Sequence, residues 1–256
     1  MKPFSMTTCA MAGPVHPLRM RARTAVATLA GAGAGLAAMI AGYRLLGRER
    51  CLHWGASTTE VQRGMPGDEL MPQPDLVATR AITISAAPEQ IWPWLVQIGP
   101  GRGGAYTYDW VENLLGLDMH SADTILPQYQ NLSVGESLPL SPSGPQMRVA
   151  VCDRASALVF ASEDGNWVWA FGLYPDRAGT RLVSRNRITT ANRSLMGRWA
   201  YQLLMEPASL VMERKMLYGI KQRVENHAHP IGETSAPDSA ATEPGAGLLA
   251  PSVEQP

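Results

Sequence analysis

Two acidic residues and a histidine between residues 107 and 127 are the side chains best suited to acid–base chemistry. Asp109 and Glu112 lie three residues apart, so they share one face of the short helix that the pattern predicts at 107–115. His120 follows nearby, and carboxylates beside an imidazole can donate and remove protons. The alternative is that these side chains cap the helix and form surface hydrogen bonds. The sequence leaves both interpretations open.

The same region contains the residue types of a nucleophilic triad. His120 and Ser121 are adjacent, and either Asp109 or Asp123 is available as the acid. A hydrolase serine of this kind usually lies on a sharp turn between a strand and a helix. No such pattern surrounds Ser121, so we assign no catalytic residue from the sequence.

A second pair of acidic residues lies in the amphipathic C-terminal segment. Glu213 interrupts an apolar helix face, and Glu206 lies seven residues earlier on roughly the same side. A carboxylate among methionines and leucines is unfavourable unless it is paired or its pKa is raised. Two interpretations are open. One is an ion pair with a buried arginine, such as Arg80 or Arg187, and the other is a polar group at the floor of a ligand cavity.

The segment from Ser194 to Asn226 is predicted to form the long helix around which the domain is organised. Apolar side chains recur with the helical period on one broad face: Leu210, Met212, Met216, Leu217, Ile220 and Val224. Pro207 lacks an N–H and favours extended geometry at the residue before it. The segment is therefore either kinked or divided into helices at about 194–205 and 207–226.

Upstream of this helix, the pattern predicts short helices and then a run of strands. A strand at 79–85 leads into a helix that begins near Pro88, and the glycine-rich loop at 99–104 precedes the second short helix. Proline and glycine clusters then separate five predicted strands, at 133–140, 146–153, 158–162, 167–174 and 180–188. This order predicts an α+β fold built on successive antiparallel hairpins.

The last two predicted strands carry unusual side chains. One face of the strand at 167–174 is largely aromatic: Trp167, Trp169, Phe171 and Leu173. Such a face must be covered by a large element, and the C-terminal helix is the predicted cover. Polar side chains occupy both faces of the strand at 180–188: Ser184 and Asn186 on one, Arg185 and Arg187 on the other. This pattern favours a wet cavity over a dry core.

The N-terminal region contains an uncharged run from Thr24 to Tyr43 between two groups of arginines. Its length fits one membrane crossing, which needs about 20 residues, so we predict a transmembrane helix at 24–46. A cleaved signal peptide and a buried soluble helix are the alternatives. Arginines at both ends leave the orientation undecided. Gly31 and Gly35 are spaced so that two such helices could form a weak homodimer.

The composition argues against several kinds of partner. The chain has 256 residues, and its 22 basic and 22 acidic residues balance, so nothing indicates a nucleic-acid surface. Its three cysteines, Cys9, Cys51 and Cys152, are far apart and form neither a disulfide framework nor a CxxC metal motif. We therefore expect no metal site, no cofactor and no nucleic-acid partner.

Three stretches of the chain resemble a known superfamily. ATRAITISAAPEQIWPWLVQIG, which begins at Ala78, is similar to the opening strand and helix of the START-like superfamily, also called SRPBCC or helix-grip. A membrane-anchored bacterial branch of that superfamily is similar to two further stretches, GGAYTYDWVENLLGLDMHSAD and EPASLVMERKMLYGIKQRVE. The superfamily as a whole also includes polyketide cyclases and lipid carriers. The resemblance covers residues 77–226. It implies a curved antiparallel sheet wrapped around the long C-terminal helix, with a hydrophobic cavity between them.

This resemblance divides the chain into five parts. They are an N-terminal tail at 1–23, the transmembrane helix at 24–46, an irregular linker at 47–76, the START-like domain at 77–226, and a disordered tail at 227–256.

The cavity that the resemblance implies would be lined by the sheet, the long helix and the loops at its mouth. The candidate ligand-binding residues are Arg80, Tyr106, Tyr108, Asp109, Trp110, Glu112, His120, Trp167, Trp169, Arg185, Arg187, Glu206 and Glu213. The superfamily shares no catalytic residue set that can be carried over to this sequence, so the function must be argued from the site.

Three functions remain open. The first is an anchored module of the cell membrane that binds or transfers a lipid or another apolar small molecule. The second is an enzyme of the cyclase, dehydratase or hydrolase type that acts in the same cavity. The third is a structural or regulatory membrane protein whose cavity is filled by side chains.

Overall fold

The computed structural model describes residues 34–35, 37–114, 116–139, 146–190 and 194–228. The uncharged run before residue 34 and the tail after residue 228 lie outside the described residues. The predictions of an N-terminal tail, of most of the transmembrane helix and of a disordered C-terminal tail therefore stay predictions.

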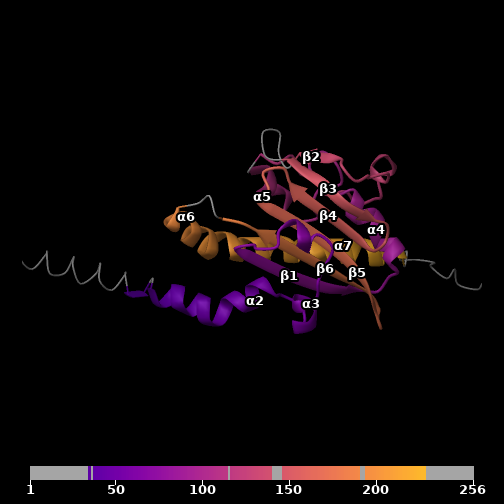
Figure 1. Ribbon diagram of the computed structural model, residues 1–256. Coiled ribbons are helices and arrows are strands. Elements are labelled where there is room, and N and C mark those ends of the chain that lie inside the picture. Colours follow the sequence, from indigo (N-terminus) through magenta and orange to yellow (C-terminus); the bar gives the residue numbers. More distant parts are fainter. Residues whose placement is uncertain (1–33, 36, 115, 140–145, 191–193, 229–256) are drawn as a thin grey trace, which may run out of the picture.

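Within the described residues, the strands form one six-stranded antiparallel sheet in the order β1-β6-β5-β4-β3-β2 (Figure 1). The strands are β1 (Leu76–Ile84), β2 (Ser137–Pro139), β3 (Gln146–Asp153), β4 (Ala157–Ser162), β5 (Trp167–Asp176) and β6 (Gly179–Ile188). Every predicted strand is present, although β2 is shorter than expected. The chain thus returns from β6 to pair with β1 at the far edge of the hairpin series.

A long helix crosses the inner face of this sheet, as predicted (Figure 1). It consists of α6 (Leu195–Ala200), a π-helical segment η4 (Tyr201–Met205) and α7 (Glu206–Ala228). The widened π-helical segment ends at Met205, two residues before Pro207, which donates no N–H to the preceding turn. The proline therefore changes the local winding without dividing the helix.

The main core lies between α7 and the inner face of the sheet. Met216, Leu217, Ile220 and Val224 of α7 are buried against a cluster that includes Phe171 and Leu173 of β5. The prediction that the apolar face of the C-terminal helix covers the aromatic face of the strand is therefore confirmed. Close contact here requires Gly219, because a Cβ atom would lie 2.5 Å from the carbonyl oxygen of Tyr106.

Two short helices precede the hairpin series, as the sequence predicted. They are α4 (Pro88–Val96) and α5 (Asp109–Leu114), and the 3-10 turn η3 (Pro127–Tyr129) follows them. The apolar side chains of one side of α4 are buried: Ile91, Trp92, Leu95, Val96 and, just after the helix, Ile98. These side chains join the main core at one end of α7.

The segment predicted to be an irregular linker instead contains three short helical elements. They are α2 (Arg48–Leu52), α3 (Thr58–Gln62) and the 3-10 turn η2 (Asp68–Leu70). Met65 and Met71 are buried against Ala81, Val159 and other residues on the outer face of the sheet. The expectation of an irregular linker is therefore wrong, because spaced methionines and a Ser57–Glu60 capping box give this segment its own packing and helix signals.

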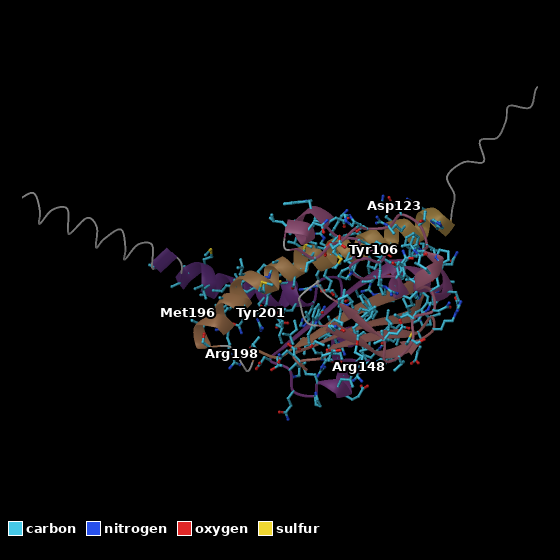
Figure 2. All side chains as sticks on the ribbon, turned by 90° about the horizontal axis from the view of Figure 1, so that it is seen from above. Tyr106, Asp123, Arg148, Met196, Arg198 and Tyr201 are labelled. Atoms are coloured by element: carbon cyan, nitrogen blue, oxygen red, sulfur yellow. The ribbon has the colours of Figure 1, made fainter. Side chains whose placement is uncertain are left out.

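The described residues before α2 continue it as a helix with a π-helical segment, η1 (Tyr43–Gly47). This helix and α6 project from the same end of the domain (Figures 1 and 2). They touch where the Arg44 guanidinium lies 4.6 Å from the Trp199 ring. Among the described residues, no helix combines the length and the apolar character needed to cross a membrane.

Candidate functional site

A cavity of about 570 Å³ lies between the inner face of the sheet and the N-terminal half of α7. Its third wall is the segment from Ala105 to Met119, which includes α5. The walls contain many apolar side chains: Leu76, Ala78, Ala105, Leu117, Met119, Trp167, Trp169, Ile188, Met205, Met212 and Met216. Met205, one of these lining residues, is also 48% exposed.

The polar centre of the cavity is an ion pair between Arg80 of β1 and Glu213 of α7. Arg80 is opposite Ser184 in the sheet register, and Asn186 lies two residues further along β6 on the same face. The Ser184 hydroxyl donates to one Glu213 oxygen, and the Asn186 amide lies 3.1 and 3.2 Å from the two oxygens. The carboxylate therefore accepts bonds from three side chains.

Two indoles extend this network along β5. Trp167 Nε1 donates to Asn186 Oδ1 at 2.8 Å, and Trp169 Nε1 donates to Ser184 Oγ at 3.1 Å. The two indole rings stack with their centroids 5.7 Å apart. The aromatic wall of the cavity is thus held in place by hydrogen bonds from its polar edges, which leaves the ring surfaces for apolar contact.

Arg80 is fully engaged on its other sides. Its Nε donates to the Cys51 carbonyl at 3.2 Å, and its second terminal nitrogen donates to Ser209 Oγ at 3.0 Å. Burial raises the pKa of Glu213 above its ordinary value, and this effect outweighs the opposing influence of Arg80 and of the hydrogen bonds from Ser184 and Asn186. Glu213 thus pairs with a buried arginine, as the first interpretation expects, and it also lines the cavity.

Glu112 of α5 occupies a different position in the same cavity. It is only 7% exposed, and its Oε2 atom is buried without a hydrogen-bond partner. The nearby Thr107 hydroxyl is also buried without a partner and lines the cavity. Burial raises the pKa of Glu112, and the charge of Asp109 raises it further, while the proximity of Thr107 acts in the opposite direction.

The proposed acid–base and triad groups do not assemble. His120 has a side chain that is 77% exposed and pairs with Asp118 at 3.3 Å. Asp109 accepts from the backbone N–H of Ser121 at 2.8 Å and from its hydroxyl at 2.6 Å. Of the two interpretations left open, the structure therefore favours the capping one for Asp109, which fixes the turn at Ser121, and it places neither Asp109 nor His120 in the cavity lining.

Three aromatic candidates from the same region also lie outside the cavity lining. Trp110 is 71% exposed and Tyr108 is 37% exposed. Tyr106 is buried beneath α7 (Figure 2), where its hydroxyl donates to the Trp94 carbonyl and accepts from Gln97, both at 2.9 Å. Tyr106 therefore holds this segment in place without facing the cavity.

The arginines of β6 lie on the opposite face of the sheet. Arg187 pairs with Asp68 at 3.0 Å, and Arg185 pairs with the same carboxylate at 2.8 Å. Arg185 also donates to the carbonyls of Glu60, Val61 and Arg63 at the end of α3. The expectation that these arginines line the cavity is wrong, because both belong to the packing of the outer face.

Glu206 also lies outside the cavity lining. Its carboxylate accepts from Arg48 at 2.9 Å and from the Tyr43 hydroxyl at 2.9 Å, so it joins α7 to the N-terminal helix. Of the candidate residues, five line the cavity: Arg80, Glu112, Trp167, Trp169 and Glu213. Sequence reasoning missed the cavity residues Thr107, Asn166 and Ser209, which stand at loop or helix positions without a distinguishing pattern.

The described residues contain no group of three or more histidine, cysteine, aspartate or glutamate side chains arranged to hold a metal ion. Cys51 is buried, and its thiol donates to the Glu206 carbonyl at 3.3 Å. Its place in the fold is therefore explained by packing and hydrogen bonding.

No protein-family model and no curated protein matches the chain. Solved structures are similar to it. The Polyketide_cyc-like protein Cgl2372 from Corynebacterium glutamicum is 17% identical, and the match covers 64% of this chain and 99% of that protein with a TM-score of 0.35. The AHSA1-like protein from Aeromonas hydrophila is 14% identical over 60% of this chain and 94% of its own, with a TM-score of 0.34.

Another similar structure is the protein SSP2350 from Staphylococcus saprophyticus, which is 12% identical over 59% of this chain and 93% of its own, with a TM-score of 0.38. The printed names of two of these similar structures are thus polyketide cyclase-like and AHSA1-like. The assignment of the helix-grip fold itself rests on the strand order and on the position of α7 across the inner face.

Proposed function

We propose that this protein binds a small, mainly apolar molecule in the cavity under α7. The cavity carries this proposal: its volume of about 570 Å³ lies within the range of ligand sites, about 300–1,000 Å³. Side chains therefore do not fill it, as the structural alternative requires. Its apolar walls and a few fixed polar groups are the usual composition of a site for a small organic molecule.

The polar centre supports binding over catalysis. Glu213 is held by Arg80, Ser184 and Asn186, so a proton transfer at this carboxylate would disrupt a network that also positions both indoles. A hydrogen-bond network whose members are all paired makes the surrounding structure rigid, and here it fixes the wall of the cavity. The catalytic alternative has one supporting observation, which is the raised pKa of Glu112 inside the cavity.

We further propose that the ligand is a lipid or a similar membrane-soluble molecule that reaches the cavity from a bilayer. The projecting helices carry exposed apolar side chains: Met39, Leu45, Leu46, Met196, Trp199, Leu204 and Met205. Arg44 and Arg50 of the N-terminal helix are also exposed, as is Arg198 of α6 (Figure 2). Apolar side chains flanked by arginines suit the boundary between lipid headgroups and acyl chains.

The position of these projecting helices, whose exposed end we call the tip, supports the same proposal. Met205 belongs both to the exposed tip and to the cavity wall. The uncharged run that begins at Thr24 leads directly into the N-terminal helix. We therefore propose a single-pass anchor at 24–46 in the cell membrane, which holds the cavity opening close to the lipid.

The first test is native mass spectrometry of the full chain in lipid nanodiscs, followed by lipid extraction. We expect one apolar molecule per chain to be retained. Met212→Trp fills the cavity and should abolish retention, while Val211→Trp, on the neighbouring exposed position of α7, should not. Equal retention by both variants, or no retention and no binding of a lipid panel by the wild type, overturns the proposal.

The anchor is tested separately by extracting membranes from expressing cells with alkaline carbonate. The full chain should stay in the pellet, as a spanning protein does. Met196→Glu combined with Leu204→Glu should leave this result unchanged but weaken ligand retention, because both residues lie in the C-terminal helix outside the anchor. Release of the wild-type chain into the supernatant contradicts the anchor without bearing on the cavity.

A further inference from the structure

Glu112 and Thr107 differ from the other polar groups around the cavity. The Glu112 carboxyl group is more than nine-tenths buried, yet its Oε2 atom accepts no hydrogen bond. The Thr107 hydroxyl is buried beside it in the same condition. Buried polar atoms in native proteins nearly always have a hydrogen-bond partner. Two neighbouring polar groups that line a cavity without one therefore indicate a hydrogen-bond partner from outside the chain.

Local structure holds both side chains toward the cavity. Tyr106 has a left-handed backbone conformation with φ of 58°, and its buried hydroxyl bonds fix it beneath α7. Two residues beyond Thr107, Asp109 binds the turn at Ser121, and α5 begins. The opposite side of α5 is exposed at Trp110, so Glu112 takes the cavity side. This arrangement keeps the unpaired atoms in a fixed position.

The chemistry of the two groups defines what they can bind. A carboxylate oxygen accepts a hydrogen bond, and a threonine hydroxyl both donates and accepts. A hydroxyl group on a ligand can donate to Glu112 and accept from Thr107 at once. Among the described lining residues, the one arginine is Arg80, which is committed to Glu213, Cys51 and Ser209. A ligand carboxylate would therefore meet Glu112 without a free cation to offset the repulsion.

An ammonium group fits less well than a hydroxyl. It has three N–H donors to satisfy and a large desolvation cost in an apolar cavity. We infer that Glu112 and Thr107 form a polar subsite that selects a mainly apolar molecule bearing a hydroxyl group. This inference rests on the proposed function, because it names the class of ligand that the cavity takes.

The test uses four probes that share a brominated ten-carbon chain: 10-bromodecanol, 10-bromodecanoic acid, 10-bromodecylamine and 1-bromodecane. Bromine quenches the fluorescence of tryptophan at contact, and Trp167 and Trp169 line the cavity. The full chain is measured in nanodiscs, with probe uptake by empty nanodiscs subtracted. The wild type should bind 10-bromodecanol about tenfold more tightly than 1-bromodecane, the gain of one to two net hydrogen bonds.

Three variants separate the hydrogen bonds from the apolar contact. Glu112→Leu and Thr107→Val should remove most of the preference for the alcohol and leave 1-bromodecane binding unchanged. Glu112→Gln keeps an acceptor oxygen and should retain much of the preference. Glu89→Leu is the matched control on the exposed surface of α4 and should behave as the wild type. None of these variants adds an unpaired charge to the interior.

Each result has a distinct meaning. Equal binding of alcohol and bromoalkane, unaffected by Glu112→Leu, overturns the subsite and leaves the proposed function standing. Tightest binding of the amine, lost in Glu112→Gln, overturns the hydroxyl assignment in favour of an ion pair. Quenching by none of the probes overturns the proposed function, and the subsite with it.

Discussion

The two faces of β6 use polar side chains in opposite ways. On the outer face, Arg185 and Arg187 are bound by Asp68 and by backbone carbonyls of the segment that covers the sheet. On the inner face, Ser184 and Asn186 bind Glu213 beside an open cavity. The outer face is therefore closed by its polar contacts, whereas the inner face uses them to hold a space open.

The carboxylates show the same contrast in their protonation. Burial alone would raise the pKa of Glu60 on the outer face, but Arg181 and Ser57 outweigh it and lower the pKa to about 2. Burial dominates for Glu213 and Glu112 on the inner face and raises the pKa of both. A paired surface carboxylate stabilises the fold, while a carboxylate beside the cavity is kept at some cost in stability.

The largest effect is expected from removing the arginine of the inner network. Arg80→Met leaves Glu213 buried without its cation and should lower the free energy of unfolding by about 4 kcal/mol. Urea denaturation followed by circular dichroism measures it. The double variant Arg80→Met, Glu213→Leu should recover much of the loss. A double variant as unstable as the single one would contradict the assignment of the loss to the unpaired charge.

The corresponding change on the outer face should be smaller and should spare the cavity. Arg185→Met removes the donor to three carbonyls and to Asp68, so we expect a loss of about 3 kcal/mol. Ligand retention should remain that of the wild type in the folded protein. A loss of ligand at a temperature where the variant is fully folded would show that the two faces are coupled.

The two faces should also respond to pH with opposite sign. Glu60 has a lowered pKa in the folded state, so it stabilises the fold above about pH 4.3, and this stabilisation is lost as the pH falls toward 2. Solvent screening of this partly exposed group reduces the contribution to about 2 kcal/mol. Glu112 has a raised pKa, so the folded state binds its proton more tightly and loses stability as the pH rises above about 4.3.

Urea midpoints of Glu60→Gln, Glu112→Gln and the wild type between pH 3 and pH 8 test this pair of signs. Glu60→Gln should be most destabilised relative to the wild type at neutral pH. Glu112→Gln should gain about 1 kcal/mol over the wild type there and converge with it in acid. Because Glu213 is present in all three proteins, its own titration cancels in the differences. Parallel curves would contradict the contrast between the faces.

The smallest effect is expected at His120, which belongs to neither network. His120→Ala removes an exposed side chain paired only with the equally exposed Asp118, so stability should change by less than about 0.5 kcal/mol. Retention of the ligand should be unchanged. Loss of a measurable turnover in this variant would restore the catalytic interpretation.

The sequence was sufficient for the architecture because periodic patterns extend over many residues. The spacing of the apolar stripe in α7 and of the aromatic face in β5 was enough to predict that the two pack together. The carboxylate of Glu213 on an apolar face predicted a buried partner, and Arg80 on the inner face of β1 is that partner. Long, regular elements reveal which side of each is buried.

The candidate site was harder to predict from the sequence, because much of its wall comes from irregular segments. Asp118 has a left-handed φ of 49°, and the His120 side chain that follows is exposed, and neither feature has a periodic signal in the sequence. The parity of Arg185 and Arg187 was read correctly, but the packing of residues 57–72 on the outer face carried no simple period. The alternation along β6 thus grouped its polar side chains by face, but it did not indicate which of the two faces borders the cavity.

Cys51 makes two buried contacts, one to α7 and one to β1. Its thiol donates to the Glu206 carbonyl, and its own carbonyl accepts from Arg80. The N-terminal segment is therefore not an exchangeable tether. Grafting the domain onto a foreign leader that replaces residues up to Leu52 would remove the Cys51 thiol donor together with the Tyr43 and Arg48 donors to Glu206. The modular unit of this protein begins within its N-terminal helix, ahead of the first strand of its sheet.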